Sequence, residues 1–287
     1  MTESIVFYAL FTSQLVLISY YFPRRFHQRM RTVFQTYSPD EYPRLYPKPV
    51  SYYERMHRNY RLTNQFLLIL GCSVMVAMLA VDFDLSAKGA QMVPWAIFMI
   101  QVMPQLALEL VEYKQMKLMR QSDQRTTRKA ELSPRRLFDS VPKVLFVFAI
   151  AFFVVSLSLD AAINDFNIGF GTGTFYRGLI VGLTNVGFAF VAWRIIYGKK
   201  YNPYQRGTER SLQARAAITS MLYVSIGMSL YMFTTECIDT YELDRLSPAA
   251  MSLYCQLIAV ASLSTMLNAL RLDRLDFEVY REKPQTA

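Results

Sequence analysis

The chain has 287 residues, of which 53% are hydrophobic and only 18% are charged. The apolar residues form blocks of about twenty rather than an amphipathic pattern. This composition excludes a disordered chain, a disulfide scaffold and an ordinary soluble enzyme. The formal net charge of +9 would suggest nucleic acid as the partner of a soluble protein. Because the basic residues here lie between apolar blocks, we expect no nucleic-acid binding and contacts with anionic lipid headgroups instead.

Residues that commonly carry metal or covalent chemistry are scarce, with 3 Cys and 2 His in the whole sequence. Cys72 and Cys255 fall inside apolar blocks, which argues against a disulfide framework. His27 and His57 lie beside basic loop residues, so they cannot build a histidine-rich site inside a membrane. A phosphate-binding Gly-Lys-Ser/Thr loop and a Gly-x-Ser-x-Gly nucleophile elbow are also missing from the sequence. We therefore expect no metal, no cofactor and no enzymatic activity.

Seven windows are long and apolar enough to cross roughly 30 Å of hydrocarbon. They predict an all-α integral membrane protein, in which residues 1–287 form a single polytopic domain and one helix precedes three helical hairpins. The first window is followed by arginines and lacks basic residues before it, so we expect an anchor rather than a cleaved signal peptide. The windows are Ser4–Phe22, Leu62–Val81, Val93–Tyr113, Val144–Leu159, Arg177–Ile196, Ala214–Thr235 and Ala249–Leu270.

The distribution of lysine and arginine orients these windows. Alternate loops and the C-terminus hold 28 of the 31 basic residues, whereas Lys88, Arg177 and Arg245 lie on the other side among acidic residues that we expect to be solvated. The positive-inside rule then places the N-terminus outside and the C-terminus in the cytoplasm. The short loops suit a bacterial inner membrane, and a eukaryotic membrane with the same cytosolic polarity fits nearly as well. The three hairpins share one plan, but they show no residue-by-residue match, and the charge rule explains the plan without a triplication.

Two basic cytoplasmic loops are predicted, at residues 23–61 and 114–141. The first is rich in tyrosine and proline; its prolines exclude a regular helix up to about Val50, and Ser51–Arg61 is expected to form a short interfacial helix. The second loop begins as an extension of the third window and is interrupted at Ser133–Pro134. The first loop is predicted to contact lipid headgroups or a partner through Arg24, Arg25, Arg29, Arg31, Arg55, Arg58 and Arg61.

A polar stripe marks the third window. Gln101, Gln105, Glu109 and Glu112 are spaced by 4, 4 and 3 residues, so they lie on one side of a helix. Such a stripe should face protein or water rather than lipid. In one interpretation, it lines a polar pathway or a binding site, and Glu109 binds a cation or carries a proton. In the other, the glutamates pair with Arg194 or Arg215 near the membrane surface and the amides bond to other helices.

Two further windows show faces suited to helix contact. The sixth window has a hydroxyl-bearing face, with a gap at Gly227, that consists of Ser220, Tyr223, Tyr231 and Thr234. We expect it to face the polar stripe. In the fifth window, Gly178 and Gly182 are four residues apart, a spacing that favours close packing of helices.

The favoured function is a non-catalytic membrane subunit or scaffold that binds lipid or a protein partner, possibly another copy of itself, through its basic cytoplasmic loops. The first alternative is a transporter or channel whose polar pathway is lined by the third and sixth windows. The second is a lipid-modifying enzyme in which Glu109 and Glu112 act as acid and base.

Overall fold

A computed structural model describes residues 2–122, 137–198, 202–205, 207–269 and 271–281. Within these ranges the chain is helical and contains no strand, which confirms the all-α prediction. Seven helical segments are long and apolar enough to span a membrane, and they coincide with the seven predicted windows. Their bounds are α1 Thr2–Val16 continued by α2 Phe22–Thr36, α3 Val50–Ala80, α4 Met92–Ser122, α6 Lys143–Ile163, α7 Gly173–Tyr197, α8 Gly207–Thr240 and α9 Ser247–Ala269.

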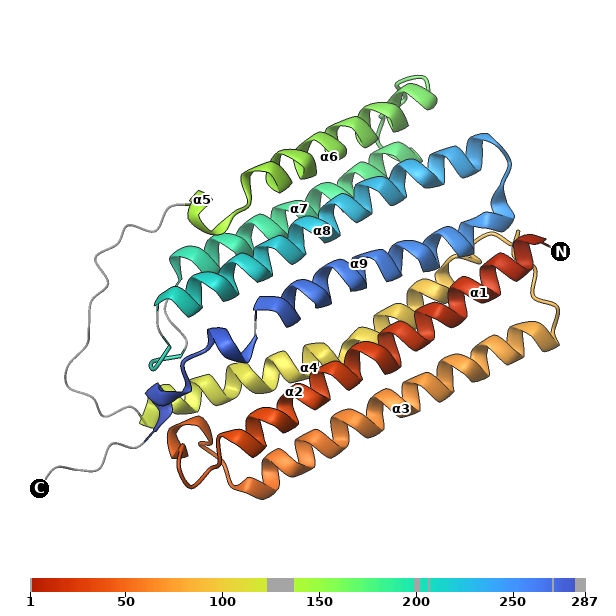
Figure 1. Cartoon of the computed structure of the whole chain (residues 1–287). Helices are drawn as coiled ribbons and strands as arrows, with labels where there is room; N and C mark the ends of the chain where they lie inside the picture. Colours follow the sequence, from red (N-terminus) through yellow and green to blue (C-terminus); the bar gives the residue numbers. More distant parts are fainter. Residues whose placement is uncertain (1, 123–136, 199–201, 206, 270, 282–287) are drawn as a thin grey trace, which may run out of the picture.

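The helices form an elongated bundle of two parts (Figure 1). One part holds α1 to α4; the other holds α6 and α7 packed on α8, and α9 lies between them in contact with α8, α1 and α4. Close approaches position these helices. A Cβ atom at Gly71 of α3 would overlap the side chain of Leu15, which is fully buried in α1. A Cβ atom at Gly227 of α8 would lie 2.8 Å from Ile258 of α9.

The segment 23–61, predicted as a loop, is instead helical over most of its length. The first helix continues through α2 to Thr36, and Pro23 is accommodated as the second residue of α2, directly after the π-helical turn Leu17–Tyr21. Because α3 starts at Val50, the predicted interfacial helix is simply the beginning of α3. The effect assigned to the prolines is confirmed, since residues 37–49 contain only the short 3-10 turn Pro43–Leu45.

The other basic segment, 114–141, follows the expected pattern where it is described. The third predicted window extends to Ser122 as part of α4, and a four-residue helix, α5 Leu137–Ser140, precedes Pro142 and α6. The predicted interruption at Ser133–Pro134 lies outside the described residues.

One end of the bundle carries an aromatic cap, which we define as Tyr42, Met119, Tyr204, Phe277 and Tyr280. The cap joins segments far apart in sequence: Tyr42 donates a hydrogen bond to Glu278 at 2.9 Å, and Asn202 donates one to the Tyr280 hydroxyl at 2.6 Å. We call this the cap end. The N-terminus lies at the opposite end, here called the N-terminal end (Figure 1).

Candidate functional site: a lateral cavity between α4 and α7

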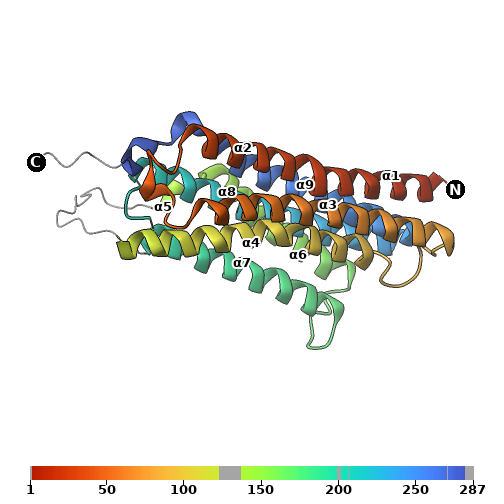
Figure 2. The same cartoon turned by 90° about the horizontal axis from the view of Figure 1, so that it is seen from below.

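A cavity of about 950 Å³ lies along the bundle. Residues of α4 and α7 form its walls, and residues of α8 and α9 form most of its floor. Helices α4 and α7 lie at the bottom of Figure 2. Trp95, Leu106 and Ile180 line it and are also exposed, so the cavity opens sideways between α4 and α7. Its size is at the upper limit of about 1,000 Å³ for small-molecule sites.

The lining is mainly apolar and runs the length of the bundle. On α4 it extends from Trp95 to Met116, which spans about 30 Å at the rise of an α-helix, close to the thickness of a bilayer's hydrocarbon core. Methionine is frequent among the lining residues, and its flexible thioether adapts to irregular apolar ligands. These methionines are Met99, Met116, Met221, Met228, Met232, Met251 and Met266.

All four residues of the predicted stripe, Gln101, Gln105, Glu109 and Glu112, line this cavity. Gln105 accepts a long hydrogen bond of 3.4 Å from the Tyr60 hydroxyl. Glu109 and Glu112 are exposed toward the cavity, and neither forms a hydrogen bond or ion pair with any part of the chain that the structure describes. The alternative in which they pair with Arg194 or Arg215 is therefore wrong for this structure.

Gln101 plays a different part, because it belongs to a buried network that joins three helices. Gln14 of α1 is fully buried and donates to the Pro94 carbonyl at 3.0 Å and to Gln101 at 3.3 Å. Gln101 donates to Ser19 at 2.8 Å, and Ser252 of α9 donates to Gln14 at 2.7 Å. The expectation of interhelical amide bonds thus holds for Gln101, whereas the glutamates of the same stripe remain open to the cavity.

The hydroxyl-bearing face of α8 only partly faces the stripe. Ser220 and Tyr231 line the cavity, but Tyr223 and Thr234 do not. Thr234 is instead hydrogen-bonded to the Tyr254 hydroxyl of α9 at 2.7 Å. The prediction of a facing stripe therefore holds for two of its four residues. The sequence could not separate them, because one helical face serves both the cavity and the contact with α9.

The glycine pair of α7 lies against α6. A Cβ atom at Gly178 would be 2.8 Å from the Leu157 side chain, and one at Gly182 would be 4.0 Å from the Phe153 ring. Gly178 thus permits the close approach of the two helices, while Gly182 leaves ordinary van der Waals space.

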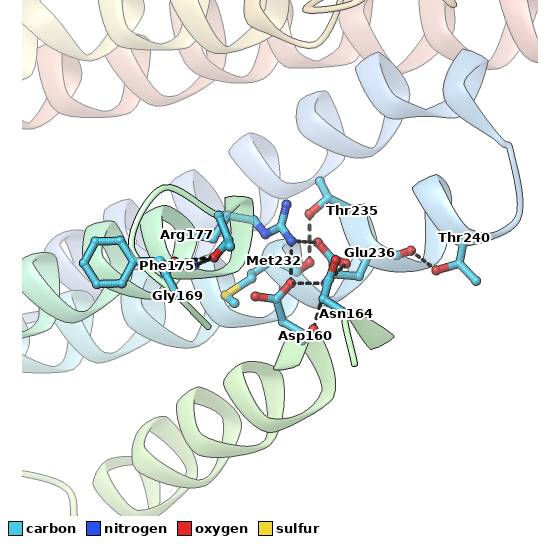
Figure 3. A network of polar contacts seen from close by, with 10 residues as sticks. Asp160, Asn164, Gly169, Phe175, Arg177, Met232, Thr235, Glu236 and Thr240 are labelled. Atoms are coloured by element: carbon cyan, nitrogen blue, oxygen red, sulfur yellow. Dashed lines mark hydrogen bonds and ion pairs between the residues drawn. The ribbon is translucent and has the colours of Figure 1, made fainter. Parts of the chain in front are cut away.

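At the N-terminal end, Arg177 lines the cavity and forms an ion-pair network that the sequence analysis did not predict (Figure 3). Its Nη2 atom lies 2.6 Å from Asp160 of α6 and 2.6 Å from Glu236 of α8. Asn164 donates to the Asp160 carbonyl at 2.8 Å and to Glu236 at 3.3 Å. Thr172 caps α7 by accepting from the Phe175 N–H at 3.2 Å, which fixes the helical turn that carries Arg177.

The burial of these acidic residues corrects the expectation that they are solvated. Asp160 is fully buried and Glu236 is 4% exposed. Removal of two carboxylates from solvent is costly unless a cation is close, and Arg177 supplies that cation from the neighbouring helix. The sequence signal was Arg177 itself, one of three basic residues on the side where acidic residues prevail.

The arginines predicted to contact lipid or a partner lie on α2 and α3. Arg29 is half-buried and donates to the Leu267 carbonyl of α9 at 3.0 Å, so it serves packing of the bundle. Arg24 and Arg25 lie over the rings of Tyr20 and Tyr21, at 5.8 and 5.5 Å from the ring centroids. The exposed members of the set are Arg24, Arg25, Arg31, Arg55, Arg58 and Arg61.

The glutamate end of the cavity adjoins the aromatic cap. Burial raises the pKa of Tyr280 to about 12, and the negative charges of Glu209, Glu112 and Asp276 contribute in the same direction. Glu209 is buried and accepts a hydrogen bond from the Asp276 N–H at 2.6 Å. Carboxylates therefore gather where the cavity adjoins the aromatic cap, although the surrounding loops are basic.

No family model, no curated protein and no solved structure matches this chain. Its function must therefore be inferred from the cavity and the groups that line it.

Proposed function

We propose that this chain is a multi-pass membrane protein that binds a lipid-like amphiphile in the cavity between α4 and α7. The observation that carries the proposal is a mainly apolar cavity that extends over about 30 Å and opens sideways. A lateral opening gives access from the bilayer, and an apolar lining favours a hydrocarbon chain over a hydrated ion. The stripe is polar only from Gln101 toward the cap end, which argues against a continuous polar pathway. The proposed role is binding rather than catalysis.

We also propose an orientation of the helical bundle in the membrane. We place the cap end in the cytoplasm, in a bacterial inner membrane, because the exposed arginines of α2 and α3 lie there and attract anionic headgroups. A reporter fused after Asp165 should be exported, and one fused after Tyr204 should stay in the cytoplasm. Exposure of both fusions on one face would contradict the orientation but would leave the cavity unaffected.

The binding proposal is tested by filling the cavity. Ala217 of α8 lines it, so the larger side chain of Ala217→Phe should exclude a bound chain. The matched control is Ala107→Phe on α4, whose side chain is exposed and lies outside the cavity. After purification in dodecyl maltoside, native mass spectrometry should detect a retained amphiphile on the wild type and on Ala107→Phe.

The Ala217→Phe variant should retain several-fold less of that amphiphile than the wild type, with an unchanged melting temperature in detergent. Equal retention by all three proteins, or no retention by the wild type, would contradict the proposal.

A further inference from the structure

We infer that the amphiphile carries a cationic amine headgroup, which binds at Glu109 and Glu112 with its chain running toward Trp95. This inference rests on the proposed function and specifies its ligand. The proposed ligand is a bilayer-derived molecule with a protonated or quaternary amine and a long apolar chain.

The first observation is the pair of acidic side chains. Glu109 and Glu112 are three residues apart on α4, so they project from the same face into the cavity. They have no hydrogen-bond or ion-pair partner in the described part of the chain. Two carboxylates held this close beside apolar side chains repel each other, and a cation between them would offset the repulsion.

The second observation is the distribution of charge around the cavity. Among the described lining residues, Arg177 is the only basic one; it lies at the N-terminal end and already contacts Asp160 and Glu236. At the adjoining aromatic cap, Glu112, Glu209 and Asp276 are close enough for their negative charges to act on Tyr280. The described lining at this end of the cavity contains carboxylates and no basic side chain, so charge complementarity favours an amine over an anionic headgroup.

The third observation is an unused polar group in the same region. The Ser262 hydroxyl of α9 is buried and lines the cavity, and it has no hydrogen-bond partner among the described residues. A buried hydroxyl without a partner is unfavourable, and an N–H or O–H group of a headgroup that reached it would supply the missing bond. Ser262 is followed along the cavity by Met266 and Ala269, near the end of α9.

The cavity lining toward the N-terminal end suits the alkyl chain of such a molecule. Trp95 and Glu109 lie on the same helix, about 21 Å apart along its axis. The α8 and α9 residues between these depths include Met228, Val224, Ile258 and Ala259. A long alkyl chain anchored at Glu109 would therefore place its terminal carbon near Trp95.

Binding near Trp95 can be measured by quenching of tryptophan fluorescence, because the protein has only 2 Trp. The second, Trp193 on α7, is exposed and lies outside the cavity. In a Trp193→Phe background, Trp95 becomes the sole fluorescent reporter. The probes are hexadecylamine, hexadecanol and hexadecanesulfonate, each brominated at the terminal carbon so that it quenches a nearby tryptophan. They are added at neutral pH to protein in dodecyl maltoside.

We expect the amine to quench Trp95 at about tenfold lower concentration than the sulfonate, with the alcohol between them. The double variant Glu109→Gln, Glu112→Gln should lose this preference while the alcohol still quenches, which shows that the cavity is intact. Equal quenching by all three probes, or an unchanged preference in the double variant, would overturn the amine headgroup and leave amphiphile binding standing. If no probe quenches Trp95 more in this background than in the same protein carrying Ala217→Phe, the proposed function itself fails.

Discussion

Replacement of Arg177 by methionine should lower the free energy of unfolding by about 3 kcal/mol. The variant leaves Asp160 and Glu236 buried without the cation that lies 2.6 Å from each. Breaking a buried ion pair by removing one partner costs about 3–5 kcal/mol, and the lower value applies because the Arg177 side chain is 33% exposed. Unfolding in mixed detergent and SDS micelles, followed by circular dichroism, measures the difference.

An exposed ion pair provides the matched control for this prediction. Arg245 and Glu3 approach to 4.0 Å, and both side chains are exposed. Arg245→Met should therefore change stability by less than about 1 kcal/mol. The triple variant Arg177→Met, Asp160→Asn, Glu236→Gln removes all the charges together and should recover part of the loss. Equal stability of Arg177→Met and the wild type would show that the network contributes nothing to the fold.

Replacement of Gln14 by leucine should have the second largest effect, a loss of about 2 kcal/mol. Gln14 is fully buried and bonds to the Pro94 carbonyl, Gln101 and Ser252. Interhelical hydrogen bonds in membrane proteins contribute about 0.6–2 kcal/mol each, and the variant leaves the partners without their bonds. The same unfolding measurement applies.

Gln65 on α3 is the control, because its side chain is exposed and forms no hydrogen bond with the described residues. Gln65→Leu should not destabilise the protein. A loss in Gln65→Leu as large as in Gln14→Leu would mean that general polarity, rather than the buried network, determines stability.

The sequence predicts the helices well because a helix able to cross a bilayer needs a continuous apolar block, and such a block is visible without any knowledge of tertiary contacts. The errors fall at the ends of the blocks. The continuation of the first helix to Thr36 could not be seen, because Arg24 and Arg25 end the apolar block although they do not end the helix. Hydropathy reports where the chain leaves hydrocarbon, and helices extend beyond that point.

Only part of the candidate site could be predicted from the sequence, for a related reason. The spacing of Gln101, Gln105, Glu109 and Glu112 within one helix is a local property, so their common face could be predicted. Which of them meets a neighbour depends on the placement of α1, and only the structure shows that Gln101 contacts Gln14 whereas Glu109 does not. The network of Asp160 with Glu236 joins residues from two helices distant in sequence, and no periodicity within one helix indicates such a contact.

We propose that a bilayer-derived chain occupies the space between α4 and α7. An electron cryomicroscopy map of the protein in nanodiscs made from its own membrane lipids tests this most directly. We predict elongated density along α4 that ends in a headgroup beside Glu109 and Glu112. Direct packing of α7 on α4, with side chains filling the space between Trp95 and Met116, would contradict the account.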